Sequence, residues 1–477
     1  MPGLPLRLAV SFVAGLAGCL VTLAAGAVGD LPPEVDTALQ RARVPDTALV
    51  AVVQDAASGR TVLSLRAAQP VNPASLAKLF TTAAALDQLG PAWTWTTPVW
   101  LAGPVRDGVL EGSLHLKGSG DPKLVLERLW LMLRRVQQSG VREIRGDIVL
   151  DGSAFAPADG APADFDGEPN RPYNVRPEAL LLNYKAVTYT FVPDPARGVA
   201  QVLVEPPLAG HVVDRTVPLS AGPCDDWRGG LKAQPGDPLR MRFAGSYPAA
   251  CGEQVWPLAD PAPASYNGRL LEGLWREMGG QLTGVAREGP APATKPSFEL
   301  RSPPLLEVVR EINKFSNNVM AQQLFLTLAA QREPGRPASS QGAREGLRRW
   351  VTARLGYPGA ELVVDNGSGL SRDGRASARL LARLLQSGWD SPWAAELASS
   401  LPIAGVDGTL RRARGGQGRA QLKTGSLRDV TGVAGYVLAD SGRRYVLVAI
   451  VNHPQAGAAR PALDALVQWV MRDAPAR

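Results

Sequence analysis

The sequence predicts an α+β fold, in which a central antiparallel sheet with helices is interrupted by a large β-rich insertion. Strand hairpins and helical patterns occur at both ends of the 477-residue chain, and short alternating runs among many Pro and Gly residues fill the middle. The two ends share one character and the middle has another, so we expect one domain that the insertion splits. We expect an antiparallel sheet because its hairpins lie at opposite ends of the chain.

The first elements form a hairpin and a helix. Residues 48–53 are apolar and β-branched, residues 55–59 have turn chemistry, and residues 61–65 resume the strand pattern. Apolar residues at helical spacing then follow Ser75, and Gly90 marks the stop. We therefore expect a hairpin followed by a helix that begins near Ser75.

The middle of the chain is rich in short strands and loops. From about residue 93 to 292, alternating runs such as 113–116 and 147–150 stand among Pro and Gly residues, with one helix at 124–137. The Pro-rich stretch 290–296 is typical of a linker at a domain boundary.

The last third returns to helices and then to strands. We expect helices at residues 305–312, 319–330, 342–355 and 377–385. A strand pair at 432–438 and 444–451 flanks the turn 440–442, and an amphipathic helix at 462–471 closes the chain.

The net charge is mildly basic at +7, from 51 basic and 44 acidic residues. No run of five or more Lys or Arg occurs, so we expect no nucleic-acid partner, and an acidic polymer fits the charge at least as well. The chain has only eight Lys, so a Lys at a chemically meaningful spacing carries more information than usual.

Residues 1–29 are expected to be a signal peptide. A basic start precedes an uncharged apolar run from 8 to 28, and small residues near Ala27 favour cleavage there. Two alternatives stay open. The run is long enough to span a bilayer uncleaved, and residues 16–19 resemble a lipobox that would place a lipid on Cys19. All three place the body of the protein outside the cytoplasm, so we expect a periplasmic or otherwise exported protein. Its only membrane contact would be this segment or that lipid.

Cys224 and Cys251 remain when Cys19 is set aside, an even pair in an exported chain. In an oxidising compartment such a pair is typical of one disulfide, here inside the insertion and away from the motifs described next. Closing a loop of about 27 residues would give roughly 3 kcal/mol. Two free thiols are the alternative.

Ser75 and Lys78 form the first chemical motif. The spacing Ser-x-x-Lys places both side chains on one face of a helix. A Lys whose pKa is lowered by burial and by a neighbouring cation can take the proton of the Ser hydroxyl. The amino terminus of the helix adds positive potential where an oxyanion forms. Alone the motif is weak, because a capped helix with a solvated Lys has the same spacing.

A second motif, Lys423-Thr424-Gly425-Ser426, precedes the last strand pair. A Lys on an edge strand can bind a carboxylate, and the Gly beside it lets a substrate backbone approach closely. We expect Lys423 to be exposed at the edge of a cleft. The alternative is a strand-edge Lys beside a turn Gly.

The third motif, Ser316-x-Asn318, lies between two helical patterns. The stretch Ser265-x-Asn267 also fits Ser-x-Asn. We prefer Ser316 and Asn318 because they lie in the helical part that holds the other two motifs. Ser265 begins an amphipathic run and is expected to be an amino-terminal cap.

Other chemistries are poorly served by this sequence. It has three His, no His-Glu-x-x-His pair, no Cys-x-x-Cys and no Gly-x-Ser-x-Gly. We therefore expect no metal site, no cofactor and no nucleophile-elbow hydrolase.

Together, the three motifs in this order resemble the signature of penicillin-binding proteins and serine β-lactamases. The 241 residues from Ser75 to Ser316 resemble the large insertion of the D-alanyl-D-alanine carboxypeptidase/endopeptidase family of the penicillin-binding protein 4 (DacB) type. Residues 73–86, 118–122 and 365–372 also look like that family. The resemblance covers nearly the whole mature chain.

The resemblance implies a penicillin-binding, β-lactamase-like catalytic domain at residues 30–93 and 297–477. Two smaller domains would be inserted in it, domain II at 94–156 and 259–296 and domain III at 157–258.

The resemblance also implies a substrate class. The substrates would be peptidoglycan and muropeptides whose stem peptides end in, or are cross-linked through, D-alanine, and β-lactam antibiotics would acylate the same serine. Ser75 would attack the scissile carbonyl and Lys78 would take its proton. The backbone amides of Ser75 and Ser426 would form the oxyanion hole.

The remaining motif residues would handle the two ends of the scissile bond. Ser316 would relay protons toward the leaving amine, and Asn318 would hold the substrate amide. Lys423 and Thr424, beside Gly425, would bind the terminal carboxylate. Two alternatives remain at this point: a serine β-lactamase-like hydrolase, and a catalytically silent murein-binding protein.

Overall fold

The structure is a computed structural model that describes residues 29–237 and 239–473. The expected cleavage site near Ala27 and the lipid site at Cys19 lie outside these residues. Within the described ranges no helix is both long and apolar enough to cross a membrane.

The two ends of the chain meet in one five-stranded sheet. Its order is β2 (Thr61–Leu65), β1 (Leu49–Asp55), β25 (Arg444–Asn452), β24 (Val430–Leu438) and β23 (Ala420–Leu427). Every neighbouring pair is antiparallel. The prediction of an antiparallel sheet built from both ends of the chain is therefore confirmed.

This sheet is covered by helices on both faces. Val50 and Val52 of β1 pack in the core with the helices of the catalytic motifs, whereas Leu49, Ala51 and Val53 pack with the terminal helices. The alternation follows from the two-residue period of a strand. Because both faces are covered, β1 is buried at all seven positions.

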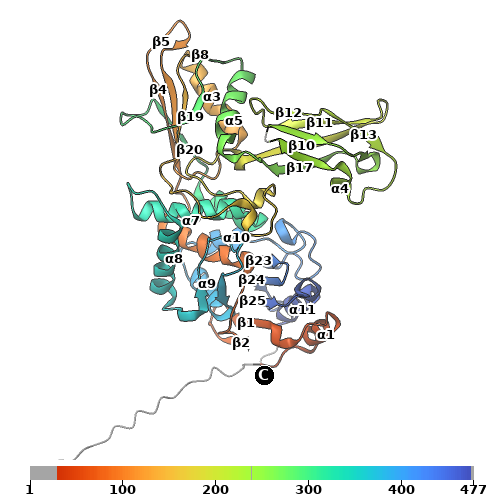
Figure 1. The fold of residues 1–477 in the computed structure, drawn as a ribbon. Coiled ribbons are helices and arrows are strands. Elements are labelled where there is room, and N and C mark those ends of the chain that lie inside the picture. The colour runs from red at the N-terminus through yellow and green to blue at the C-terminus, as the bar shows by residue number, and fades with distance from the viewer. Residues whose placement is uncertain (1–28, 238, 474–477) are drawn as a thin grey trace, which may run out of the picture.

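The helices that pack around this sheet fall into two groups (Figure 1). Those on the motif side are α2 (Lys78–Leu89), α6 (Leu305–Phe315), α7 (Asn318–Arg332), α8 (Ser340–Leu355), α9 (Ala378–Trp389) and α10 (Ala394–Ser400). The terminal pair is α1 (Pro33–Arg41) and α11 (Arg460–Met471), which pack against each other. The expected helices are confirmed with ends shifted by a few residues, and α1 and α10 are additional.

The insertion forms two further bodies. The first holds a sheet of β19 (Ala286–Glu288), β9 (Ile148–Asp151), β7 (Ser113–Lys117), β4 (Thr96–Ala102) and β20 (Phe298–Arg301). It also holds a sheet of the short strands β18 (Gln281–Leu282), β8 (Glu143–Ile144), β6 (Val109–Leu110) and β5 (Val105–Arg106). The helices α3 (Leu126–Gln138) and α5 (Pro263–Glu277) pack with these strands.

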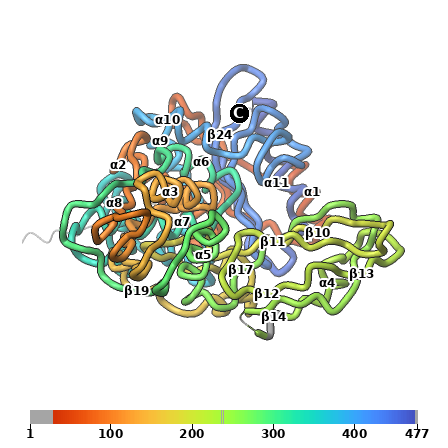
Figure 2. Tube along the Cα trace, turned by 90° about the horizontal axis from the view of Figure 1, so that it is seen from above, coloured from red at the N-terminus to blue at the C-terminus, as the bar shows by residue number. Residues whose placement is uncertain are grey.

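The second body projects to one side of the first (Figure 2). Its main sheet contains β16 (Tyr247–Pro248), β13 (Thr216–Ser220), β11 (Val199–Glu205), β10 (Ala186–Asp194) and β17 (Gln254–Ala259). A smaller sheet contains β12 (Val212–Val213), β15 (Arg240–Phe243) and β14 (Ala233–Asp237), beside the short helix α4 (Trp227–Leu231). Cys224 and Cys251 are disulfide-bonded here, as predicted.

The stretch 290–296 has no regular secondary structure, as expected of a linker. However, β20 follows it and pairs with β4 of the inserted sheet. The chain therefore re-enters the catalytic body after Arg301, a few residues later than the expected boundary at 297. The sequence could not reveal this, because a four-residue edge strand has almost no pattern of its own.

Candidate active site

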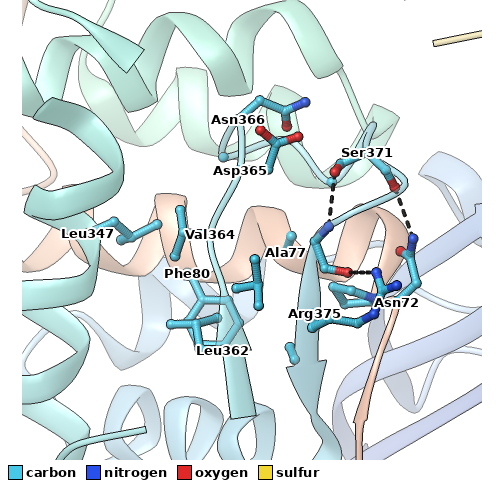
Figure 3. Close-up of a pocket in the computed structure, with 16 residues that line it drawn as sticks. Asn72, Ala77, Phe80, Leu347, Leu362, Val364, Asp365, Asn366, Ser371 and Arg375 are labelled. Carbon is cyan, nitrogen blue, oxygen red and sulfur yellow. Dashed lines mark hydrogen bonds between the residues drawn. The ribbon is translucent and has the colours of Figure 1, made fainter. Parts of the chain in front are cut away.

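Ser75 lies in a tight 3₁₀ turn, Ala74–Ala77, that runs directly into α2. The preceding residue, Ala74, has a φ of 46°, a left-handed conformation that is costly for a residue with a Cβ. Asn72 holds the turn. Its Oδ1 accepts a hydrogen bond from the Ala74 N–H at 2.8 Å. Its Nδ2 donates to the Ser371 carbonyl at 2.9 Å, the bond that Figure 3 shows between these two residues. The nucleophile candidate thus sits on a rigid, strained turn.

Lys78 is fully buried, and its Nζ lies 3.0 Å from Ser75 Oγ. Nζ also donates to Asn318 Oδ1 and to the Ser368 carbonyl, each at 2.6 Å. A neutral amine has two hydrogens and one lone pair, so it can satisfy both acceptors and still accept the Ser75 proton. Burial lowers the pKa of Lys78 well below its usual range, and the nearby Lys423 lowers it further. The arrangement suits a general base.

Ser316 and Lys423 form a second buried contact beside the first. Ser316 ends α6 in the left-handed conformation, with a φ of 57°. Lys423 Nζ donates to Ser316 Oγ at 2.9 Å and to the Thr424 carbonyl at 2.8 Å. Because Ser316 Oγ accepts from the lysine, its own hydrogen is available to a group in the cleft.

Lys423 lies on the edge strand β23, as predicted, but it is fully buried, so the expected exposure is wrong. Ser316 and the Thr424 carbonyl hold its amine beneath the surface. Burial lowers the pKa of Lys423 to about 7. Its charge is therefore sensitive to whatever anion enters the cleft.

The open edge of β23 presents backbone groups to the cleft. The Leu422 N–H donates to the Pro402 carbonyl, away from β24, at 2.9 Å. Alternate residues of a strand point their N–H groups the same way, and the pairing with β24 has no register shift. The N–H of Ser426 therefore also points to the open edge, where Ser75 lines the same cleft.

Gly425 is required by the close approach of β23 to the Ser75 turn. A Cβ at this position would lie 2.7 Å from the Pro73 carbonyl oxygen. No side chain fits there without moving the backbone that carries the nucleophile candidate. The sequence predicts that Gly425 lets a substrate backbone approach closely. In the structure the backbone that approaches it is that of the protein's own Ser75 turn.

Asn318 is the first residue of α7, whose cap is Asn317. Lys78 Nζ donates to Asn318 Oδ1, and Nδ2 of the same amide has no hydrogen-bond partner among the described residues. The side chain also lines the cleft. It can therefore position the lysine and donate to a substrate carbonyl at the same time.

Of these residues, Ser75, Ser316, Asn318 and Ser426 border a cleft of about 990 Å³ between the split domain and the insertion. The insertion supplies one wall with Phe165, Asp166, Tyr173, Asn183, Tyr184 and Thr188. Sequence analysis assigned no role to any of them. Three consecutive residues of this wall, 183–185, have left-handed backbone conformations. Such a run has no recognisable pattern in a sequence.

The loop between β21 (Leu362–Val363) and β22 (Arg375–Ser377) forms another part of the site that sequence analysis left without a role. It supplies the Ser368 carbonyl to Lys78, and its Arg372 lies 4.7 Å from the Phe165 ring of the insertion. Figure 3 shows the loop packed against Phe80 of α2. The cavity that remains there is only about 30 Å³, so the loop is a packed support of the site.

The competing stretch Ser265-x-Asn267 lies away from this cleft, in the first turn of α5. Ser265 is not the cap, which is Ala262; its hydroxyl donates to the Ala262 carbonyl and accepts from Arg269. The expected cap is therefore wrong by three residues. Among the described residues no group of three or more His, Cys, Asp or Glu side chains could hold a metal ion.

A sequence profile of the D-Ala-D-Ala carboxypeptidase 3 (S13) family matches residues 31–473. The chain is 30% identical over 471 residues to a D-alanyl-D-alanine carboxypeptidase of Actinomadura sp. (strain R39), covering 93% of this chain and 85% of that protein. It is 25% identical over 401 residues to the D-alanyl-D-alanine carboxypeptidase DacB of Haemophilus influenzae, covering 80% of each.

The fold is similar to the crystal structure of penicillin binding protein 4 (dacB) from Haemophilus influenzae. The TM-score is 0.74 at 22% identity, and the match covers 91% of this chain and 99% of that one. The same protein complexed with a novel β-lactam matches with a TM-score of 0.69 over the same shares.

Proposed function

The chain belongs to the D-Ala-D-Ala carboxypeptidase 3 (S13) family, and from this premise we propose that Ser75 is its nucleophile and Lys78 its general base. It is a serine D-alanyl-D-alanine carboxypeptidase, a hydrolase of the penicillin-binding protein 4 (DacB) type. Peptidoglycan stem peptides and their cross-links are the proposed substrates, and β-lactams the proposed inhibitors.

Acylation begins at the buried pair. Ser75 Oγ attacks the carbonyl carbon of the scissile peptide bond, and its proton passes to the lone pair of neutral Lys78 Nζ. The two acceptors of Nζ, Asn318 Oδ1 and the Ser368 carbonyl, also hold the protonated amine that results. The charge developing on the substrate oxygen is met by the N–H groups of Ser75 and Ser426, which we propose as the oxyanion hole.

The leaving amine needs a proton, and Ser316 is placed to give one. Its hydroxyl accepts from Lys423, so its hydrogen can pass to the leaving nitrogen, and the proton is replaced through the lysine. Lys423 and Thr424 bind the carboxylate of the leaving residue, which favours the charged form of the lysine. Asn318 Nδ2 donates to the carbonyl of the acyl chain.

Water then completes the reaction. The proton that Lys78 took from Ser75 first returns to Lys423, which lost one through Ser316 to the leaving amine, so Lys78 is neutral again. Lys78 then takes a proton from the water while the hydroxide attacks the Ser75 ester, and it gives that proton to the Ser75 oxygen as the shortened peptide leaves. A β-lactam follows the same first step, but the amine of its opened ring stays attached to the acyl group. The ester then blocks the cleft, which is the basis of the proposed inhibition.

Lys78 carries this assignment, because it is fully buried and lies 3.0 Å from Ser75 Oγ. The test is to incubate the purified protein with fluorescent penicillin and with a cross-linked muropeptide, following label release and peptide cleavage. Wild type should be labelled once per chain, release label slowly and cleave the muropeptide. Ser75→Ala should show neither labelling nor muropeptide cleavage, although its melting temperature should match that of wild type. The control Ser265→Ala, in the competing motif, should be labelled like wild type.

Two outcomes would contradict the proposal. Stoichiometric labelling of Ser75→Ala would sink the nucleophile assignment. Rapid release of label without muropeptide cleavage would restore the β-lactamase interpretation, which the family match disfavours, as it does a silent murein-binding protein.

We propose a catalytic domain formed by residues 30–93 and by residues from about 302 to 477, which encloses domains II and III. Its second boundary is moved from the expected 297 because β20 pairs with β4. We further infer that the protein is exported, with residues 1–29 as the signal, because its substrates are components of the cell envelope. The intact mass of the protein recovered from the envelope would show cleavage near Ala27, a lipid on Cys19 or neither.

A further inference from the structure

A second cavity, of about 570 Å³, lies near the catalytic cleft and has four arginines among its nine lining residues. We call it the arginine pocket; the residues used below are Thr409, Arg411, Arg412, Arg414, Arg460 and Asp464. Its first four residues belong to the segment between α10 and β23, and the last two lie in the first turns of α11.

The charges of three of the four arginines in the arginine pocket are not neutralised by the protein, while the fourth, Arg460, interacts with Asp464. Arg411, Arg412 and Arg414 are exposed, and none forms an ion pair or a side-chain hydrogen bond with another residue in the described part of the chain. By contrast, Arg419 a few residues later pairs with Asp440. The one acid in the pocket is Asp464, and burial raises the pKa of its carboxyl. Several like charges around one hollow favour an anion from outside.

The pocket begins at the catalytic site. Asp407, just before it, is held by Lys314 of α6 at 2.6 Å. Thr409 Oγ1 lies 2.7 Å from Oγ1 of Thr424, the residue proposed to bind the substrate carboxylate. One side chain therefore separates the arginine pocket from the carboxylate position.

The two cavities meet the motif strand at different positions. The catalytic cleft is lined by Ser426, Leu427 and Arg428, the carboxyl end of β23 and the residue after it. The arginine pocket is reached from Thr424 through Thr409. In the proposed mechanism Ser426 contributes to the oxyanion hole and Thr424 binds the carboxylate of the leaving residue, so the arginine pocket is on the leaving-group side.

We propose that the arginine pocket binds the carboxylates of a second stem peptide, the leaving chain of a cross-linked substrate. This deepens the proposed function and rests on it. In carboxypeptidase turnover the leaving group is a single amino acid, whose carboxylate is already held at Thr424. In endopeptidase turnover it is a whole peptide with further free carboxylates, and a chain that continues past Thr409 meets the arginines. Arginine binds carboxylates through two parallel hydrogen bonds, which suits this ligand.

The test compares three substrates with wild type and the triple variant Arg411→Gln/Arg412→Gln/Arg414→Gln. They are a pentapeptide that releases one D-alanine, a cross-linked peptide dimer with free carboxylates, and the same dimer with every leaving-side carboxylate amidated except the one beside the scissile bond. A matched variant, Arg240→Gln/Arg242→Gln/Arg348→Gln, removes three exposed arginines elsewhere. Penicillin acylation is measured throughout.

The triple variant should lose about tenfold in kcat/KM on the free-carboxylate dimer, since three exposed charge pairs are each worth a small factor. Its kcat/KM on the pentapeptide and the amidated dimer, and its acylation rate, should stay within twofold of wild type. The matched variant should resemble wild type on every substrate.

Other results would overturn the inference. An equal loss on all substrates would make the pocket a support of the catalytic site. If the triple variant cleaves the dimer like wild type but is no longer retained on an immobilised phosphodiester polymer, the arginine pocket binds such a polymer and not a stem peptide. If wild type is not acylated by penicillin at all, the proposed function falls and the inference falls with it; if acylation is normal and the dimers are not distinguished, only the inference falls.

Discussion

Two lysines lie buried behind the catalytic cleft and several arginines surround the neighbouring arginine pocket, and water reaches these two groups of cationic side chains very differently. Lys78 and Lys423 are fully buried, whereas Arg411, Arg412 and Arg414 are exposed. Burial disfavours the charged form of a lysine, so its proton becomes available to chemistry. An exposed guanidinium keeps its charge, so it binds anions and does not transfer protons. The contrast teaches that burial decides whether a basic side chain moves protons or binds anions.

The largest effect should come from removing the buried base. Lys78→Met and Lys78→Arg should each slow penicillin acylation by roughly 10²- to 10⁴-fold, because neither side chain can accept the Ser75 proton. Stopped-flow labelling measures the rate, and a melting curve checks folding. The control Lys295→Met changes an exposed lysine and should leave the rate unchanged. Wild-type acylation in Lys78→Arg would remove the distinction between the two regions, because a permanent charge would then suffice.

Loss of the second buried lysine should be selective for the substrate carboxylate. Lys423→Met should lower kcat/KM on free-acid D-alanine peptides about 10- to 150-fold, since a charge-assisted hydrogen bond is worth roughly 1.5–3 kcal/mol. On an amidated peptide the loss should be smaller, because that substrate has no carboxylate to bind. Equal losses on acid and amide would mean that Lys423 is not the carboxylate anchor; Arg428 would be tested next.

The buried lysines should also make stability depend on pH. Unfolded lysine titrates near 10.5, and burial lowers the pKa of Lys423 to about 7 in the folded state. Between pH 7 and 10 the unfolded chain therefore holds more protons than the folded one, and the free energy of unfolding rises with pH. For one lysine the slope approaches about 1.4 kcal/mol per pH unit between these two pKa values. Urea midpoints at pH 7, 8 and 9 should rise less steeply in Lys423→Met, and parallel slopes would contradict the lowered pKa.

The smallest effect should be salt screening of the exposed region. Raising the salt from about 0.05 to 0.5 M shortens the Debye length severalfold. Cleavage of the cross-linked dimer by wild type should slow a few-fold, and cleavage by the arginine triple variant should not. Penicillin acylation, which depends on the buried lysines, should change little in either protein. A salt effect of the same size on acylation would show that the two regions are not separate.

The motifs could be read from the sequence because their chemistry is local or rests on rare residues. Ser75 and Lys78 share one helical turn, and Lys423 stands out in a chain with eight lysines. The hairpin 48–65 and the strands 432–451 contain short runs of apolar and β-branched residues bounded by turn residues. These signals predicted the split domain with its antiparallel sheet, and the structure brings Ser316, Asn318 and Lys423 to the Ser75 turn.

What the sequence could not predict depends on contacts between distant segments. Lys423 was expected to be exposed because an edge strand usually is, but α6 ends against it and buries it. The Ser368 carbonyl is a backbone group that every residue type has, so its contact with Lys78 could not be predicted from the residue at this position. Tyr184 enters the cleft through three left-handed residues, and the arginine pocket joins two segments more than 40 residues apart in sequence. None of these has a periodic pattern.

The charge state of Lys78 tests the central claim most directly. With eight lysines, the chain labelled with ¹³Cε-lysine gives few signals, and the one absent in Lys78→Arg belongs to Lys78. At pH 8 this signal should have the chemical shift of a neutral amine, and Lys423 should titrate near pH 7. A Lys78 signal that titrates together with the exposed lysines would show that the amine is charged at working pH, and it could not be the base that activates Ser75.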